Sequence, residues 1–153
     1  MRLGDVLKKE RMLRGISVED TAAKLGVAVE DYQQLESGHS PIEKWGPLLA
    51  RMAVKLGAPT SRLISETGQS LAARPGGCGL LIKRQRESKH ISPEEMALVL
   101  DLSKTDYAEI ENGESPLEYC GPLLLRFAEV IEQPIFNLFY PCGVALDKLS
   151  NYP

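Results

Sequence analysis

The sequence predicts an all-α protein built from two tandem five-helix units. The first observation is an internal repeat: at an offset of 75 residues, residues 3–64 align with residues 78–139 without a gap. The second is periodicity, because apolar residues recur at the three- and four-residue spacing of helices, and no stretch shows the alternation of a strand. A repeat of this length indicates that one helical fold occurs twice.

The repeat also predicts the domain boundaries. We expect a first unit over residues 1–66, a linker over residues 67–77, and a second unit over residues 78–153 that includes a short C-terminal tail. The linker, TGQSLAARPGG, is rich in glycine, proline and serine. Its eleven residues span at most ~36 Å when extended, so many placements of one unit against the other are open.

Composition places the chain among soluble globular proteins. Of 153 residues, 43% are apolar and 25% are charged. No apolar run approaches the ~20 residues of a spanning helix, and the first residues lack the apolar middle of a signal peptide. We therefore expect a cytoplasmic protein with no membrane partner. Three widely spaced cysteines without CxxC pairs predict neither a disulfide framework nor a zinc site, and we expect no metal or cofactor.

The charge differs between the two halves. Residues 1–66 hold ten Lys/Arg and nine Asp/Glu, whereas residues 78–153 hold seven and twelve. The net charge of −3 gives no support to nucleic-acid binding, and the asymmetry suggests different roles for the two halves.

The first two helices of each unit are predicted by spacing and by capping residues. In the first unit, Leu3, Leu7 and the aliphatic stem of Arg11 share a helical face that ends before Gly15. Ser17 then caps a second helix, as Ser92 does in the repeat. The turn after this helix falls at a glycine or an aspartate, which both tolerate a left-handed backbone (Gly26 and Asp101).

The remaining helices are predicted from their apolar faces and their boundaries. A third helix over residues 28–37 buries Tyr32 and Leu35 and ends at Gly38. Pro47 is predicted to open a fourth helix and Pro59 a short fifth one. The loop between the third and fourth helices would then be long.

The order of these motifs resembles a known family. The patterns L-x-x-x-L-x-x-x-R-x-x-x-G-I-S, A-x-x-L-G-V and Y-x-x-L-E-x-G are similar to those of the helix-turn-helix domain of lambda-repressor and Cro type regulators, the xenobiotic-response-element-like family. The resemblance covers residues 3–64 and, more loosely, residues 79–139. It implies a lambda-repressor-like fold for each unit and a DNA-binding transcriptional regulator.

The resemblance also implies a structural ion pair in each unit. In the family, an arginine late in the first helix commonly pairs with a glutamate near the end of the third. Arg11 and Glu36 hold those places, and Arg86 and Glu111 repeat them. A guanidinium that meets a carboxylate through two hydrogen bonds makes a well-oriented pair.

Three departures from the family pattern weaken the expectation of DNA binding. Val18 and Pro93 replace a glutamine that often contacts DNA, and the loop after the third helix is longer. The third helices, which in that family read the DNA bases and are called the reading helices below, also carry acids. Asp31 and Asp106 lie in the first helical turn, where the helix dipole favours negative charge by ~0.3–1 kcal/mol, so a structural role and a contact to cytosine are both open.

The candidate DNA contacts fall into two groups. Phosphate contacts are expected from basic residues of the first helices and from the starts of the second helices: Lys8, Lys9, Arg14, Ser17, Lys83, Arg84, Lys89 and Ser92. Base-reading contacts are expected from the third helices: Glu30, Gln33, Gln34, Ser103, Lys104 and Thr105. A solvated helix face is the alternative for the basic residues.

The second fifth-helix segment, PIFNLFYP, is too apolar to remain exposed. Its Ile135, Phe136 and Phe139 could form a homodimer contact or could belong to the core of the monomer. The two tandem copies could also act as a built-in pseudo-dimer, since dimeric readers of this class place two helices ~34 Å apart.

Two functions therefore follow from the sequence. The first is a sequence-specific DNA-binding transcriptional regulator that uses tandem helix-turn-helix units on double-stranded DNA. The alternative is a degenerate helix-turn-helix protein that acts as a protein–protein interaction module or regulator antagonist and docks a basic partner. An enzyme is not expected, because His39 and His90 fall at non-equivalent places without a nucleophile or a carboxylate pair.

Overall fold

The computed structural model describes residues 1–143, and this part of the chain is helical, without strands. The all-α prediction is thus confirmed. The first repeat forms α1 (Leu3–Leu13), α2 (Val18–Leu25), α3 (Val29–Ser37), α4 (Ile42–Leu56) and the 3-10 helix η1 (Thr60–Leu63). After η2 (Ser70–Ala72), the second repeat forms α5 (Gly77–Ser88), α6 (Pro93–Leu100), α7 (Lys104–Glu111), α8 (Leu117–Val130), η3 (Ile135–Leu138) and η4 (Tyr140–Cys142).

The predicted caps and turns form in both repeats. The Ser17 hydroxyl accepts a hydrogen bond from the Asp20 amide at 3.0 Å, and Ser92 does the same for Glu95 at 3.1 Å. Gly26 and Asp101, which follow α2 and α6, both adopt the left-handed conformation. The resulting α2–turn–α3 and α6–turn–α7 segments correspond to the two predicted helix-turn-helix motifs.

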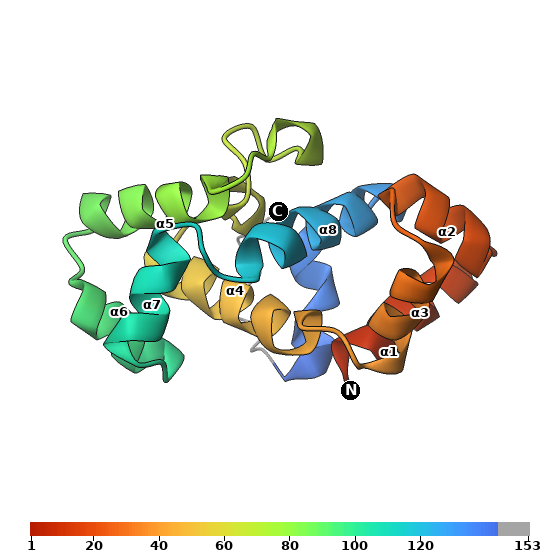
Figure 1. Ribbon diagram of the computed structural model, residues 1–153, viewed down its shortest axis with the longest axis horizontal. Coiled ribbons are helices and arrows are strands. Elements are labelled where there is room, and N and C mark those ends of the chain that lie inside the picture. The colour runs from red at the N-terminus through yellow and green to blue at the C-terminus, as the bar shows by residue number, and fades with distance from the viewer. Residues whose placement is uncertain (144–153) are drawn as a thin grey trace.

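The two repeats do not pack separately, because each fourth helix is shared between the two units. The helices α1–α3 form a first unit at one end of the molecule, and α5–α7 form a second unit at the other (Figure 1). Between the two units, α4 and α8 pack against each other. α8 packs against α5 of its own repeat and against α2 of the first repeat, and α4 packs against α1 of its own repeat and against α6 of the second. Each end of the molecule therefore contains segments of both repeats.

The segments after the fourth helices pack on the first helix of the other repeat. η1 of the first repeat packs against α5, and η3 and η4 of the second repeat pack against α1. Two equivalent glycines permit this interleaving. A Cβ atom at Gly46 would lie 2.6 Å from Leu3 and 3.1 Å from Phe139, and one at Gly121 would lie 3.3 Å from both Cys78 and Ile64. Each glycine thus sits between the first helix of its own repeat and the last buried residue of the other repeat.

Two details differ from the sequence predictions. α4 begins at Ile42, not at Pro47, and α8 likewise begins at Leu117. The prolines therefore lie inside these helices, and much of the predicted long loop is helical. A serine and a proline start the helix earlier, since the Ser40 hydroxyl accepts from the Ile42 amide at 3.3 Å and Pro41 is the N-cap residue. The short fifth helices are 3-10 helices.

The apolar segment of the second repeat belongs to the core of the monomer. Ile135, Phe136 and Phe139 are at most 8% exposed, so they offer no surface to a second chain. The homodimer predicted through these residues is contradicted, because α1 and α8 already cover them. The alternative of burial within the monomer is the one that the structure shows.

The linker is held against the second repeat. Glu129 of α8 accepts hydrogen bonds from the backbone amide of Ser70, at 2.9 Å, and from the Ser70 hydroxyl. Ser70 is buried, whereas the next residue, Leu71, is 91% exposed. The linker therefore contributes a defined wall to the surface around it.

Candidate nucleic-acid interface

The predicted Arg–Glu pairs form in both units with the same geometry. The Arg11 Nε atom donates to Glu36 at 2.6 Å and its Nη2 atom donates to the other carboxylate oxygen at 3.1 Å. Arg86 and Glu111 repeat both distances. In each unit the remaining guanidinium nitrogen donates at 2.9 Å to the carbonyl of an isoleucine (Ile16 and Ile91).

These pairs lock the first and third helices of each unit together. The paired side chains are only about a tenth exposed. In each pair, the hydrogen bond to the carboxylate raises the pKa of the arginine further above its ordinary value. A neighbouring tyrosine in each unit (Tyr32 and Tyr107) has a raised pKa, first because it is buried and then because of the adjacent glutamate. These charges are thus unavailable to DNA.

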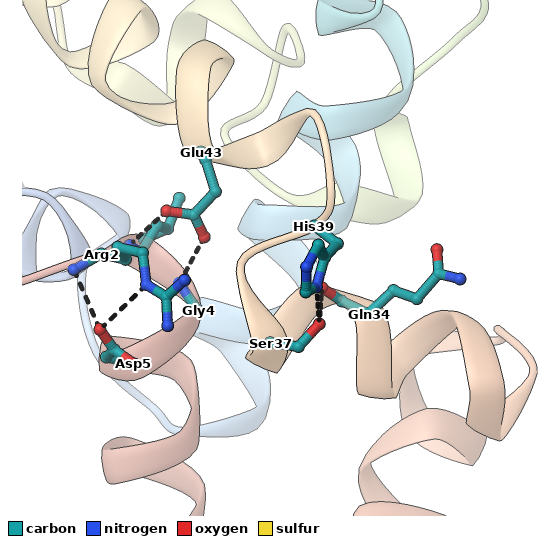
Figure 2. A network of polar contacts seen from close by, with 8 residues as sticks. Arg2, Gly4, Asp5, Gln34, Ser37, His39 and Glu43 are labelled. Carbon is teal, nitrogen blue, oxygen red and sulfur yellow. Dashed lines mark hydrogen bonds and ion pairs between the residues drawn. The ribbon is translucent and has the colours of Figure 1, made fainter.

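Figure 2 shows the polar contacts between the start of α1 and Glu43 of α4 and, beside them, those at the end of α3. The Glu43 carboxylate accepts hydrogen bonds from the amides of Leu3 at 2.9 Å and Gly4 at 2.7 Å. At the end of α3, the Ser37 hydroxyl lies 2.8 Å from His39 Nδ1. Glu118 repeats the role of Glu43 at the start of α5. The first helices therefore begin with their N-terminal amides already satisfied.

The basic candidates of α1 separate into two kinds. Lys8 and Lys9 are exposed and form no ion pair within the described part of the chain. Arg14, in contrast, donates to the carbonyl of Ile131 at 3.1 Å and pairs with Glu10. Arg14 is therefore a tie between the first unit and the end of α8, and its prediction as a phosphate contact is not supported by its geometry.

The basic candidates of α5 are more exposed. Lys83 and Lys89 have exposed side chains, and neither takes part in an ion pair among residues 1–143. Arg84 is also exposed but lies 3.2 Å from the Glu66 carboxylate. Lys89 stands where Arg14 stands in the first repeat, so the inter-repeat tie of Arg14 has no side-chain equivalent in the second unit.

The three serine candidates all serve as helix caps. Ser17 and Ser92 cap α2 and α6, and the Ser103 hydroxyl accepts from the Asp106 amide at 3.1 Å. Ser103 was predicted as a base-reading residue, and its side chain instead starts the reading helix. Its counterpart Ala28 provides no such cap to α3.

The other reading-helix candidates face solvent. Glu30, Gln33 and Gln34 of α3 are exposed, as are Lys104 and Thr105 of α7. The Lys104 ammonium lies 3.9 Å from the Glu94 carboxylate of α6, so the cation of this surface has an acidic neighbour. Asp31 and Asp106 lie in the first turns of their helices, as predicted.

Both helix-turn-helix motifs are acidic. Residues 18–37 contain five acidic residues and one lysine, a net charge of −4, and residues 93–111 contain six and one, a net charge of −5. The ion pairs with Arg11 and Arg86 neutralise one acid in each motif, which leaves net charges of −3 on the first motif and −4 on the second. Phosphate oxygens repel carboxylates, so these surfaces oppose the approach of a DNA backbone.

Each motif is braced by the fourth helix of the other repeat, which sequence reasoning missed. The Arg126 guanidinium of α8 donates to the carbonyl of Leu25 at 3.3 Å, at the end of α2. On the other side, Lys55 of α4 pairs with Glu95 of α6 at 2.7 Å. These partners lie far apart in the sequence and follow no local pattern.

Comparison with known proteins adds no further assignment: the chain matches no family model, no curated protein and no solved structure. In the described residues, no group of three or more His, Cys, Asp or Glu side chains could hold a metal ion. None of the helices in that part of the chain has the length and apolar character needed to cross a membrane.

Proposed function

We propose that this protein is a helix-turn-helix interaction module that binds a basic segment of a partner protein. The observation that carries the proposal is the net charge of −4 and −5 on the two helix-turn-helix motifs. Exposed acids stand at the starts of both helices of each motif, among them Glu19 and Glu30 in the first motif and Glu94 in the second.

The acids stand where a DNA reader needs cations. Affinity for duplex DNA comes largely from Lys and Arg side chains that neutralise phosphates. Of the seven basic candidates, Arg14 is tied to Ile131, Arg84 is paired with Glu66 and Lys104 lies near Glu94. A lysine- or arginine-rich protein segment meets the same acidic surface with attraction in place of repulsion.

The shared fourth helices, α4 and α8, hold two such surfaces in one chain. α4 and α8 pack between the two units, and each braces the motif of the opposite repeat. A partner with two basic segments could bind both motifs, and the second contact would then form at a high effective concentration. This arrangement supports an interaction module of two linked sites.

A DNA titration separates this proposal from nucleic-acid binding. Labelled duplex of random sequence is titrated with the protein at about 50 mM salt, where phosphate contacts are strongest. We expect no binding, because each motif repels the backbone. Binding that weakens steeply as salt increases would overturn the proposal.

A peptide selection tests the proposed partner chemistry directly. Random peptides displayed on phage are selected against the full chain, and we expect enrichment of lysine- and arginine-rich peptides. The combined variant Glu30→Gln, Asp31→Asn, Glu109→Gln should lose this enrichment, whereas the control Glu87→Gln, on the exposed surface of α5, should keep it. Enrichment of neutral peptides, or no effect of the triple variant, would contradict the proposal.

DNA binding by a transcriptional regulator is the second candidate, favoured by one repeated feature. Lys8 and Lys83 occupy equivalent positions, and both are exposed, as is Lys9. If the DNA titration gives salt-dependent binding, charge reversal at Lys8 and Lys9, and separately at Lys83 and Arg84, identifies the unit that contacts DNA. Each lost phosphate contact reduces the salt slope by about 0.9.

A further inference from the structure

The linker and α5 enclose a groove that no role described above uses. One part of the groove, of about 390 Å³, lies between residues 64–67, residues 72–77 and the start of α5. A second part, of about 540 Å³, lies between Pro59, Arg62 and α5. The two parts share Glu66 and Leu81, so they adjoin each other, and we call them together the linker groove.

Three arginines line the linker groove of a protein whose net charge is −3. They are Arg62 after α4, Arg74 in the linker and Arg84 on α5. Arg84 pairs with Glu66, the carboxylate of the groove, at 3.2 Å. Arg62 and Arg74 are exposed and have no carboxylate partner among residues 1–143, so two guanidinium charges remain uncompensated.

The walls of the groove combine apolar surface with one unpaired buried hydroxyl. Ile64, Leu80 and Leu81 provide apolar lining. Ser65 also lines the groove, is only 1% exposed, and has a hydroxyl without a hydrogen-bond partner in the described part of the chain.

The wall formed by the linker is fixed in place. Ser70 is held by Glu129 of α8, and the left-handed Gly68 lies against the side chain of Arg62, whose Cδ atom would be 3.3 Å from a Cβ at that glycine. The start of α5 is not itself an anion site, because Glu118 already accepts from the amides of Cys78 and Gly79. The arginine side chains, not the helix end, therefore define the charge of the groove.

The repeat shows that the fold does not require this cluster. The 75-residue offset places Asn137 opposite Arg62, Pro141 opposite Glu66 and Asp5 opposite Leu80. The Arg–Glu pairs and helix caps, which the fold needs, occur in both repeats. Arg62 and Glu66 of the linker groove are not repeated, and this asymmetry indicates a role other than stability.

We propose that the linker groove binds a small phosphorylated metabolite of nucleotide size. Each part of the groove presents one unpaired guanidinium, Arg74 or Arg62, and the planar guanidinium group matches phosphate oxygens in charge and geometry. Both parts of the groove fall in the size range of small-molecule sites, and the apolar lining suits a flat organic body. The ligand would contact the linker and both repeats at once. The site is independent of the acidic motifs.

The test is a titration followed by two-dimensional NMR of the isotope-labelled full chain. The probes are AMP, which carries a phosphate on a flat apolar body, adenosine, which lacks the phosphate, and inorganic phosphate. We expect AMP to shift the amide signals of residues 62–81, and adenosine to bind at least about tenfold more weakly because a charge-assisted contact is missing. Absence of any shift with both AMP and phosphate at about 10 mM would overturn the proposal, since such a site would be weaker than ordinary metabolite sites.

Variants assign the binding to the arginines. Arg62→Gln and Arg74→Gln should each weaken AMP binding by about tenfold, the effect of one lost charged contact. Lys24→Gln, an exposed cation on α2, is the matched control and should leave the affinity unchanged. Thermal unfolding of each variant verifies the fold. Unchanged affinity in both arginine variants would contradict the proposed site, as would an equal loss in the lysine variant.

Discussion

The first unit, α1–α3, and the second unit, α5–α7, share a backbone but not a surface. Both have the same ion-pair distances, the same serine cap at the second helix and the same left-handed turn. Their surface residues differ, as in the third helices, where Val29 and Glu30 of α3 align with Lys104 and Thr105 of α7 in the repeat. The comparison indicates that the repeated residues maintain the fold, whereas the residues that differ give the two units different surfaces.

The largest effect is expected at the repeated ion pairs. Arg11→Ala and Arg86→Ala each leave a nearly buried glutamate without its partner, which should lower the free energy of unfolding by about 3–5 kcal/mol. Chemical denaturation measures both variants. If the two losses differ by more than about 1 kcal/mol, the residues are not equivalent, and the comparison fails at its strongest point.

The next effect concerns a repeated glycine at which the first and third helices cross. A Cβ atom at Gly4 would lie 2.3 Å from the Leu35 carbonyl oxygen, and one at Gly79 would lie 2.2 Å from that of Ile110. Because backbone cannot move aside like a flexible side chain, Gly4→Ala and Gly79→Ala should each destabilise by about 1–3 kcal/mol or more. Gly77→Ala, where the nearest atom lies 3.8 Å from a Cβ, controls for the glycine substitution itself. A milder loss at the two crossings than at Gly77 would contradict the close approach.

The third effect should distinguish the two repeats. The second repeat has Cys78 and Cys120 where the first has Leu3 and Trp45, and burial raises the pKa of both thiols to about 12. In the unfolded chain a thiol ionises near pH ~8.5, so the folded state holds these protons longer. The stability that they contribute is present below that pH and is lost as pH rises towards 12, by up to about 1.4 kcal/mol per thiol and pH unit.

Denaturation at pH 8 and pH 10 measures this loss. Cys78→Ala and Cys120→Ala should each reduce the alkaline loss of stability, although they lower stability at pH 8. The tyrosines Tyr32 and Tyr107 also have raised pKa values, but they occur in both repeats and are unchanged in these variants. An alkaline loss that is the same in the wild type and both cysteine variants would show that the thiols do not cause it.

The smallest effect is expected at the end of the first helix of each unit. Gly15 and His90 both have positive φ, at 65° and 58°. A histidine in this conformation is strained relative to glycine, so His90→Gly should stabilise the protein by up to about 1 kcal/mol, whereas Gly15→His should destabilise it by a similar amount. The difference in melting temperature between these two variants checks the sign.

Local features of the fold could be predicted from the sequence. The caps at Ser17 and Ser92 and the turn at Gly26 follow from residue types at fixed spacing, and the family resemblance implies the Arg11–Glu36 pair. The structure contains all of them. The beginning of α4 was missed because Pro47, which reads as a first-turn residue, lies inside the helix, after Ser40 and Pro41 have already started it.

Contacts between the repeats could not be predicted. The linker allows many placements, so the sequence does not reveal which fourth helix packs on which unit. For this reason Arg14 was assigned to DNA, although its partner Ile131 lies 117 residues away. Arg126 and Lys55, which brace the opposite motifs, were missed for the same reason. The surface candidates, including Lys8, Gln33 and Thr105, are exposed as a binding surface requires, and their ligand stays a proposal.

The contacts of α4 and α8 with the unit of the other repeat are tested most directly by dividing the chain. Residues 1–66 and residues 78–153 are produced separately, and their oligomeric state and cooperative unfolding are measured by analytical ultracentrifugation and circular dichroism. We expect neither fragment to form a stable folded monomer, because α2 would lack α8 and α6 would lack α4. Mixing the two fragments should restore one cooperative transition in a one-to-one complex. If the fragment of residues 1–66 folds cooperatively as a monomer, the first unit does not need α8, and the account of the shared fourth helices is contradicted.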